Sequence, residues 1–189
     1  MTDNKYITET KKQFEDKIIV ITGSTQGIGA ETAKLFASRG AKGITICGRN
    51  EKKGLKIKDE IKQIGAECIF VKADLAEIED CKKIIALTDK TFGTINTFVS
   101  CAGFTERGTI LSTTLHNYEK NFNINARAPF FLMQDSIKIM RRDKQKGTIA
   151  CIITMAAYSG MPFLSAYSAS KGALTIMIKN IANSIVSDQ

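Results

Sequence analysis

The chain has 189 residues and a formal net charge of +8, with 43% hydrophobic and 24% charged residues. This length fits one domain with a sizeable core, and no apolar run approaches the roughly 20 residues needed to cross a membrane. The surplus lysines and arginines are spread along helical patterns and form no recognisable nucleic-acid motif, so we expect neither a membrane nor a nucleic-acid partner.

The elements alternate along the chain. Residues 1–14 are polar and are expected to form a flexible arm ahead of a single domain at 15–189. Short apolar runs predict five strands, at Lys17–Thr22, Gly43–Cys47, Cys68–Lys72, Ile95–Ser100 and Thr148–Thr154. Apolar residues at helical spacing predict the helices, at Gly27–Arg39, Asn50–Ile64, Glu77–Thr91, Leu115–Arg142 (divided near Pro129) and Ser165–Ser187.

Strands that alternate with helices of this length indicate βαβ units, and therefore an α/β fold with a parallel sheet and helices on both faces. The apolar runs Ile18–Ile21 and Ile149–Ile153 fit strands buried on both sides. The first helix is expected to turn four side chains inward: Ile28, Ala33, Leu35 and Phe36.

A glycine-rich turn, Thr22-Gly-Ser-Thr-Gln-Gly-Ile-Gly29, joins the first strand to the first helix. A dinucleotide pyrophosphate needs exposed backbone N–H groups and a close approach that a Cβ would block, and the positive end of a helix favours the anion. The spacing differs from the Gly-x-Gly-x-x-Gly fingerprint. The expected cofactor contacts from this turn are Thr22, Gly23, Ser24, Gln26, Gly27, Ile28 and Gly29.

The next two strand ends bear on which dinucleotide binds. The second strand is followed by Arg49, where a site for NAD would usually carry an acid for the ribose 2′-OH. An arginine can pair with a 2′-phosphate, so NADP is favoured and NAD remains the alternative. Asp74 and Leu75 follow the third strand; they either meet the adenine end of the cofactor or begin the helix Glu77–Thr91, with Asp74 as its N-cap.

Tyr167 and Lys171 are four residues apart and therefore share one face of the last predicted helix. A free phenol has a pKa of about 10, and a nearby ammonium favours the phenolate. Such a phenol can exchange a proton with an alcohol or alkoxide while a hydride moves to or from a nicotinamide. The competing interpretation is an amphipathic helix with a lysine that reaches for solvent.

The five cysteines are odd in number, scattered and without Cys-x-x-Cys pairing, which indicates small buried hydrophobes in a reducing compartment such as the cytoplasm. The single histidine, His116, has no second ligand nearby in the sequence and is expected on a helix surface. We therefore expect no metal site.

Taken together, these segments resemble the classical short-chain dehydrogenase/reductases. The resemblance covers about residues 15–189 and rests on six segments in family order: the glycine-rich turn, Asp74-Leu75, Cys101-Ala-Gly103, Asn123-Ile-Asn125, Gly147–Thr154 and Tyr167-Ser-Ala-Ser-Lys171. It implies a Rossmann-like doubly wound sheet with strand order 3-2-1-4-5.

The resemblance also implies roles for particular residues. Tyr167 would be the acid/base, and Lys171 would assist it and hold the nicotinamide ribose. Asn125 would hold a water in the proton relay, and Thr154 stands where the family has a serine that bonds the substrate oxygen. Ala102 and Gly103 would border the cofactor.

The implied activity is an NADP(H)-dependent oxidoreductase that interconverts a ketone or aldehyde and a secondary alcohol, in a homodimer or homotetramer when full length. The chain departs from the family at Thr154 and at Ser100-Cys101, and it is expected to lack the usual C-terminal strands and substrate lid. These departures favour the alternative of a catalytically inactive dinucleotide-binding or scaffold relative.

Overall fold

The computed structural model describes residues 12–187. Its strands are β1 (Ile18–Thr22), β2 (Gly43–Gly48), β3 (Glu67–Lys72), β4 (Thr97–Ser100) and β5 (Thr148–Cys151). Its helices are α2 (Gly27–Ser38), α3 (Glu51–Ile64), α4 (Ile78–Phe92), α5 (Leu115–Phe122), the π-helical turn η1 (Asn123–Arg127), α6 (Ala128–Arg142), the 3-10 turn η2 (Met155–Ala157) and α7 (Ser165–Ser187). Among these, no helix is both long and apolar enough to span a bilayer.

The five strands form one parallel sheet in the order β3-β2-β1-β4-β5, which confirms the predicted Rossmann-like topology. In the centre, Ile19 of β1 lies opposite Ile44 of β2 on one side and Thr97 of β4 on the other. Every residue of β1 is buried. The chain thus reverses its direction of winding at β1 and β4, where a doubly wound sheet opens its ligand crevice.

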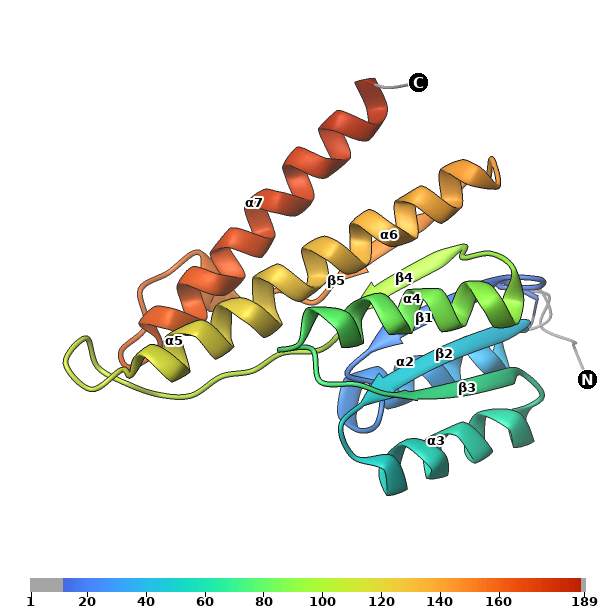
Figure 1. Ribbon diagram of the computed structural model, residues 1–189, viewed down its shortest axis with the longest axis horizontal. Helices are drawn as coiled ribbons and strands as arrows, with labels where there is room; N and C mark the ends of the chain where they lie inside the picture. The colour runs from blue at the N-terminus through green and yellow to red at the C-terminus, as the bar shows by residue number, and fades with distance from the viewer. Residues whose placement is uncertain (1–11, 188–189) are drawn as a thin grey trace, which may run out of the picture.

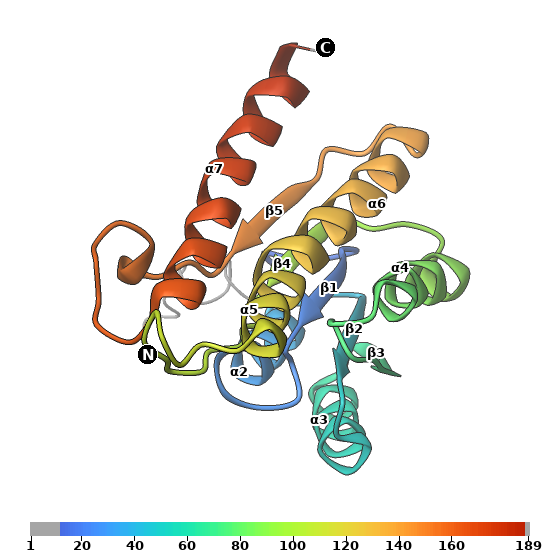
Figure 2. The same cartoon turned by 60° about the vertical axis from the view of Figure 1, so that its left-hand side comes forward.

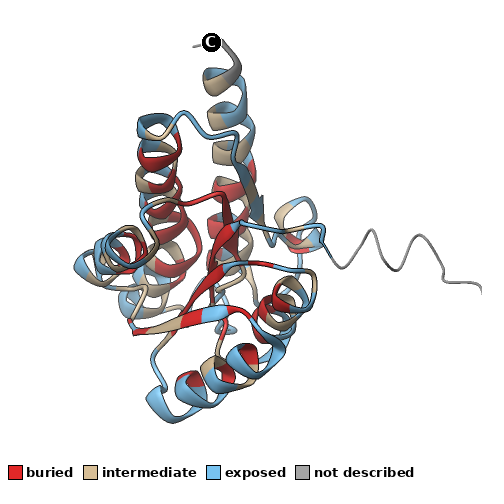
Figure 3. Cartoon of the chain, turned by 90° about the vertical axis from the view of Figure 1, so that its right-hand side faces the viewer, coloured by how far each residue is buried: buried red, intermediate tan, exposed pale blue. Residues whose placement is uncertain are grey.

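Helices cover both faces of the sheet: α2 lies behind it and α4 lies in front of it in Figure 1, and α3 packs against α2. The α2–α3 side encloses one apolar core, and α4 and α6 enclose a second core around Phe98 and Leu132. Figure 3 shows the buried segments meeting along the central strands. This sandwich holds the strand ends, and the loops that leave them, in fixed positions.

The prediction for the inner face of α2 is partly wrong. Ala33 is buried as expected and Phe36 is half-buried, but Ile28 and Leu35 are 67% and 49% exposed. The other buried positions of this helix are its small residues: Gly29, Ala30 and Ala37. Small side chains let the helix lie close to the sheet, so the larger ones are placed outside the contact.

Strand β5 is shorter and less covered than expected. It ends at Cys151 instead of Thr154, and its residues alternate between exposed and half-buried. Ile152 and Ile153, expected inside, are 40% and 39% exposed. The reason is position, because β5 pairs with β4 alone and forms the edge of the sheet in the described part of the chain.

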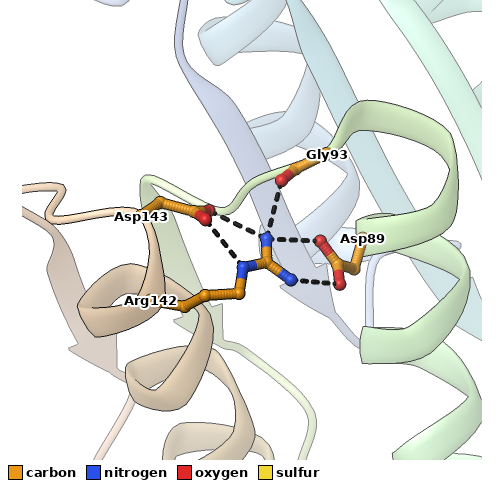
Figure 4. A network of polar contacts seen from close by, with 4 residues as sticks. All are labelled: Asp89, Gly93, Arg142 and Asp143. Carbon is orange, nitrogen blue, oxygen red and sulfur yellow. Dashed lines mark hydrogen bonds and ion pairs between the residues drawn. The ribbon is translucent and has the colours of Figure 1, made fainter.

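Helices α5 and α6 run on from one another through the π-helical turn η1, so the predicted division falls just before Pro129, which occupies the first turn of α6. Helix α7 packs against α5 and η1, and its C-terminal part extends away from the sheet (Figures 1 and 2). Three hydrogen bonds fasten the far end of α6 to α4, because Arg142 donates to both carboxylate oxygens of Asp89 and to Gly93 O (Figure 4). Arg142 also donates to its chain neighbour Asp143.

The flexible arm predicted for residues 1–14 lies mainly outside the described residues. Its last residue does not fit that description, because the Phe14 ring packs edge-on against Phe36 with 4.5 Å between centroids. Phe14 N also donates to Arg39 O at 3.0 Å. Phe14 therefore packs as part of the folded domain.

Candidate active site

A cleft of about 350 Å³ lies at the carboxyl ends of β1, β2, β3 and β4. It occupies the place that the reversal of winding predicts for a ligand. Of the expected cofactor contacts it is lined by Gly23, Gln26, Gly27, Ile28, Gly29, Arg49, Asp74, Leu75, Ala102 and Gly103. It is also lined by residues that were not predicted: Thr25, Cys47, Gly48, Ala73, Cys101, Phe104 and Ile124.

The three glycines of the turn serve different purposes. A Cβ on Gly23 would come within 2.7 Å of Ala102 Cα, and one on Gly29 within 2.4 Å of Gly23 O, so both are needed for close backbone packing. Gly27 has φ +56°, but a Cβ there would meet no atom within 4 Å. Gly27 therefore faces open space in the cleft, where a ligand can approach the backbone.

The N-terminus of α2 also opens into this cleft. Its N-cap, Gln26, makes no side-chain capping bond, and no acid lies in the first turn. The free N–H groups and the helix dipole together favour an anion at this point. The Gln26 side chain instead accepts a hydrogen bond from Lys53 Nζ at 2.7 Å, which places a lysine ammonium next to the cleft.

Two of the expected cofactor residues lie behind the cleft. Thr22 and Ser24 are fully buried. The Ser24 hydroxyl donates to Ile21 O at 2.6 Å and accepts from Cys47 N at 3.0 Å, while Thr22 Oγ1 accepts from Ala102 N at 3.3 Å. Both hydroxyls fix the turn to its neighbouring strands, and neither lines the cleft.

Arg49 lies at the end of β2, exposed, on the rim of the cleft. Its guanidinium makes no hydrogen bond or ion pair with another described residue. The acid that follows it, Glu51, is engaged by Lys72 at 3.2 Å. The rim of the cleft is therefore cationic at the end of β2.

Asp74 and Leu75 form part of the opposite wall. The N-cap of α4 is Glu77, so the prediction of Asp74 as that cap is wrong. The Asp74 carboxylate accepts from Ala76 N at 3.0 Å, and Asp74 N donates to Asp80 Oδ2 at 2.7 Å. Asp74 closes a local turn ahead of the helix, as short acidic side chains commonly do.

Helix α7, which packs in the same core as α4 and α6, carries Tyr167 and Lys171, and neither residue lines the cleft. Lys171 is 4% exposed, and its ammonium donates to Ile152 O at 2.9 Å. Burial lowers the pKa of this ammonium, while the thiols of Cys151 and Cys101 act in the opposite direction. Tyr167 is half-buried. The competing picture of a lysine reaching for solvent is therefore wrong.

Gly103 connects the two halves of the site. A Cβ on this residue would lie 3.7 Å from Lys171 Nζ and 3.8 Å from Asn125 Oδ1. Because Gly103 also lines the cleft, the lysine and the asparagine stand directly beside it. A ligand that passes Gly103 would reach the face of α7.

Asn125 lies fully buried in the π-helical turn η1. Its amide nitrogen donates to Phe104 O at 2.7 Å and to Ser170 Oγ at 3.0 Å, and its oxygen accepts from Phe104 N at 2.8 Å. The side chain thus joins the loop after β4 to α7. Such π-turns are frequent at functional sites.

Thr154 precedes η2 and caps it, since its hydroxyl accepts from Ala156 N at 3.3 Å. No hydrogen bond between Thr154 and Tyr167 is recorded in the described chain. The hydroxyl retains its own proton for donation to a ligand.

Cys47, Cys68 and Cys81 are buried as expected, whereas Cys101 and Cys151 are half-buried and Cys101 lines the cleft. Burial raises the pKa of Cys47 and Cys68 to about 12 and that of Cys81 and Cys151 to about 11. No cluster of potential metal ligands occurs among residues 12–187, and His116 is exposed.

Of the cleft residues that sequence reasoning missed, Gly48 and Ala73 carried a signal, because each is a small residue at the end of a predicted strand. Ile124 lies in a segment on which the family resemblance rests, but neither it nor Phe104 follows a predicted strand. They reach the cleft only because η1 and the loop after β4 fold back against it.

The sheet order and the cleft define a Rossmann-like nucleotide-binding fold. A family model described as short chain dehydrogenase matches residues 17–189, and the chain belongs to that family.

Two relatives illustrate the similarity. An uncharacterized oxidoreductase of Thermotoga maritima is 33% identical over 169 residues, covering 89% of this chain and 66% of that protein. An NADP-dependent (R)-specific alcohol dehydrogenase of Lentilactobacillus kefiri is 34% identical over 174 residues, covering 90% and 67%. The chain thus spans about two thirds of the length of each relative.

A solved structure shares the fold. A short chain dehydrogenase/reductase from Burkholderia phymatum, in complex with NAD, matches with a TM-score of 0.89 at 22% identity. The match covers 93% of this chain and 62% of that one.

Proposed function

We propose that this chain is the cofactor-binding part, residues 15–189, of an NADP(H)-dependent oxidoreductase that interconverts a ketone or aldehyde and a secondary alcohol. The observation that carries the proposal is the position of Gly103, which lines the cleft and stands 3.7 Å, measured from its ideal Cβ, from Lys171 Nζ. A nucleotide in the cleft would bring its far end to the helix that carries Tyr167.

The residues present fit a dinucleotide. The uncapped start of α2 and the open space at Gly27 would hold the pyrophosphate. Asp74 and Leu75 would border the adenine, and Lys171 would hold the nicotinamide ribose. When bound, the cofactor supplies or accepts the hydride.

Arg49 would read the 2′-phosphate. An unpaired guanidinium at the rim offers a planar set of donors for a phosphate, and Glu51 is occupied by Lys72. The L. kefiri relative is named as NADP-dependent, whereas the B. phymatum structure holds NAD, so NAD is the alternative for this chain.

The proton would move through Tyr167. Its phenol gives a proton to the substrate oxygen in reduction and takes it back in oxidation. The Thr154 hydroxyl would donate to the same oxygen, and Asn125 would keep Phe104 and α7 in register beside it.

Titration of the chain with NADPH and NADH, followed by nicotinamide fluorescence, tests the cofactor. Arg49→Ala is expected to lower the affinity for NADPH at least tenfold and the affinity for NADH less than twofold, because only NADPH carries the 2′-phosphate. Equal losses of affinity for the two cofactors would refute the role of Arg49.

Turnover of ketones by the full-length protein tests the chemistry. Tyr167→Phe should abolish it while cofactor affinity stays within a few-fold of wild type. Wild-type rates in this variant would refute the assignment, and cofactor binding without turnover in the unmodified protein would favour a catalytically silent binding protein.

A further inference from the structure

The π-helical turn η1 touches both halves of the cleft. Ile124 contributes to its lining. Asn125, the next residue, holds the Phe104 backbone on the side of α7. Two residues further, Arg127 points to the opposite side and donates from Nη2 to the carbonyl oxygen of Ala76.

Ala76 belongs to the turn that we call the Asp74–Ala76 wall. The backbone of this wall is held at four further points. Asp80 Oδ2 accepts from Asp74 N at 2.7 Å, Asp74 Oδ1 accepts from Ala76 N at 3.0 Å, and Cys81 Sγ donates to Leu75 O at 3.8 Å. Glu77 N, at the N-cap of α4, donates to Asp74 O at 2.9 Å. The Arg127 contact is the only one of these that comes from outside the wall and α4.

The charges around Cys81 agree with this arrangement. Burial raises the pKa of its thiol to about 11, the Arg127 charge lowers it, and the carboxylates of Asp80 and Asp74 raise it. The guanidinium therefore lies next to the first turn of α4. The Arg127 Nε is buried and finds no acceptor among the described residues. The hydrogen bond of this guanidinium is therefore to a backbone carbonyl, that of Ala76.

We propose that Arg127 is a positioning residue for the cofactor, which sets the Asp74–Ala76 wall against the adenine end of the nucleotide. The inference rests on the proposed function, because it requires a dinucleotide in the cleft. Through Arg127 and Asn125, the single turn η1 fixes the distance between the adenine wall and the loop after β4.

The chain contains its own control for this idea. Arg142, at the other end of α6, also joins the continuous helix α5–η1–α6 to α4, through Asp89 and Gly93. It does not line the cleft. Loss of Arg142 should weaken the packing of α6 on α4 without moving the Asp74–Ala76 wall. Loss of Arg127 should weaken the packing and also move the wall.

The test compares R127M and R142M in the full chain by calorimetric titration with NADPH and with 2′,5′-ADP, which carries only the adenine half. R127M is expected to weaken both ligands at least tenfold, by factors that agree within about threefold, because both share the adenine half. R142M is expected to bind both within twofold of wild type. Unfolding midpoints in urea show how far each variant is destabilised.

Each outcome decides between the possibilities. Wild-type affinity for 2′,5′-ADP in folded R127M, or an equal loss in R142M, overturns the positioning role. If R127M does not fold, R127K decides: an affinity at least threefold below wild type supports the role, and wild-type affinity overturns it. If the wild-type chain binds neither NADPH nor NADH, the proposed function fails and this assignment fails with it.

Discussion

The substitution Gly27→Ala should change the free energy of unfolding and the affinity for NADPH by different amounts. The new methyl would meet no protein atom within 4 Å, so the cost to the fold is that of a left-handed backbone alone. That conformation costs an L-residue about 1–2 kcal/mol, and the smaller entropy of the unfolded alanine chain returns about 0.4–1 kcal/mol. We expect the free energy of unfolding to fall by about 1 kcal/mol.

The ligand should respond more strongly than the fold. A methyl at Gly27 would occupy the space through which a pyrophosphate reaches the first N–H groups of α2. One lost hydrogen bond to a charged group is worth about 1.5–3 kcal/mol, and each 1.4 kcal/mol is about a tenfold change in affinity. NADPH affinity should therefore fall at least tenfold.

Gly23→Ala provides the matched contrast. Its φ is also left-handed, +63°, but its Cβ would lie 2.7 Å from Ala102 Cα. Overpacking adds about 1–3 kcal/mol, so this variant should lose about 3 kcal/mol. Urea unfolding and NADPH titration of both variants measure the effects. A Gly27→Ala protein as unstable as Gly23→Ala, or one that binds NADPH like wild type, would refute the reasoning.

Two further changes test buried polar groups. Lys171→Met should stabilise the ligand-free chain by about 1 kcal/mol at pH 7, because a buried ammonium held only by Ile152 O is removed. Since burial lowers the pKa of Lys171, the unfolded wild type binds more protons than the folded one at pH values between the lowered pKa and the ordinary value of 10.5. The wild type therefore gains stability as the pH rises through this window, so the difference in unfolding free energy between Lys171→Met and wild type should shrink. Urea unfolding at several pH values measures this difference, and a value that does not change with pH would contradict the reasoning. Ser24→Ala should lower stability by about 1–2 kcal/mol in the same assay, because Cys47 N and Ile21 O lose their buried partner; an unchanged midpoint would show that the hydroxyl does not fix the turn.

The sequence predicted the sheet well, because short apolar runs that alternate with helices indicate parallel strands, and the family resemblance implied their order. It failed where burial depends on neighbours. Ile149–Ile153 has the pattern of a central strand, yet β5 lies at the edge and its residues are only partly covered. Ile28 and Leu35 have the right spacing for an inner face, but small residues occupy that contact instead.

The site divides in the same way. The glycine-rich turn and the pair Tyr167 and Lys171 are local patterns, so they were visible in the sequence. The role of Ser24 inside the turn and the contact from Arg127 to Ala76 were not, because they depend on which backbone atoms other elements bring close. The pairing of Arg127 and Ala76 spans 51 positions of the chain, and no local spacing encodes it.

The Asp74–Ala76 wall is held through its backbone. The Asp74 amide donates to Asp80, and the carbonyl oxygens of Leu75 and Ala76 accept from Cys81 and Arg127. A surface anchored in this way keeps its place while its outward side chains are exchanged. Mutation can therefore change the size or polarity of the side chain that position 75 presents to the cleft, without disturbing the backbone that carries it. The wall is a place where binding preference can drift at little cost to the fold.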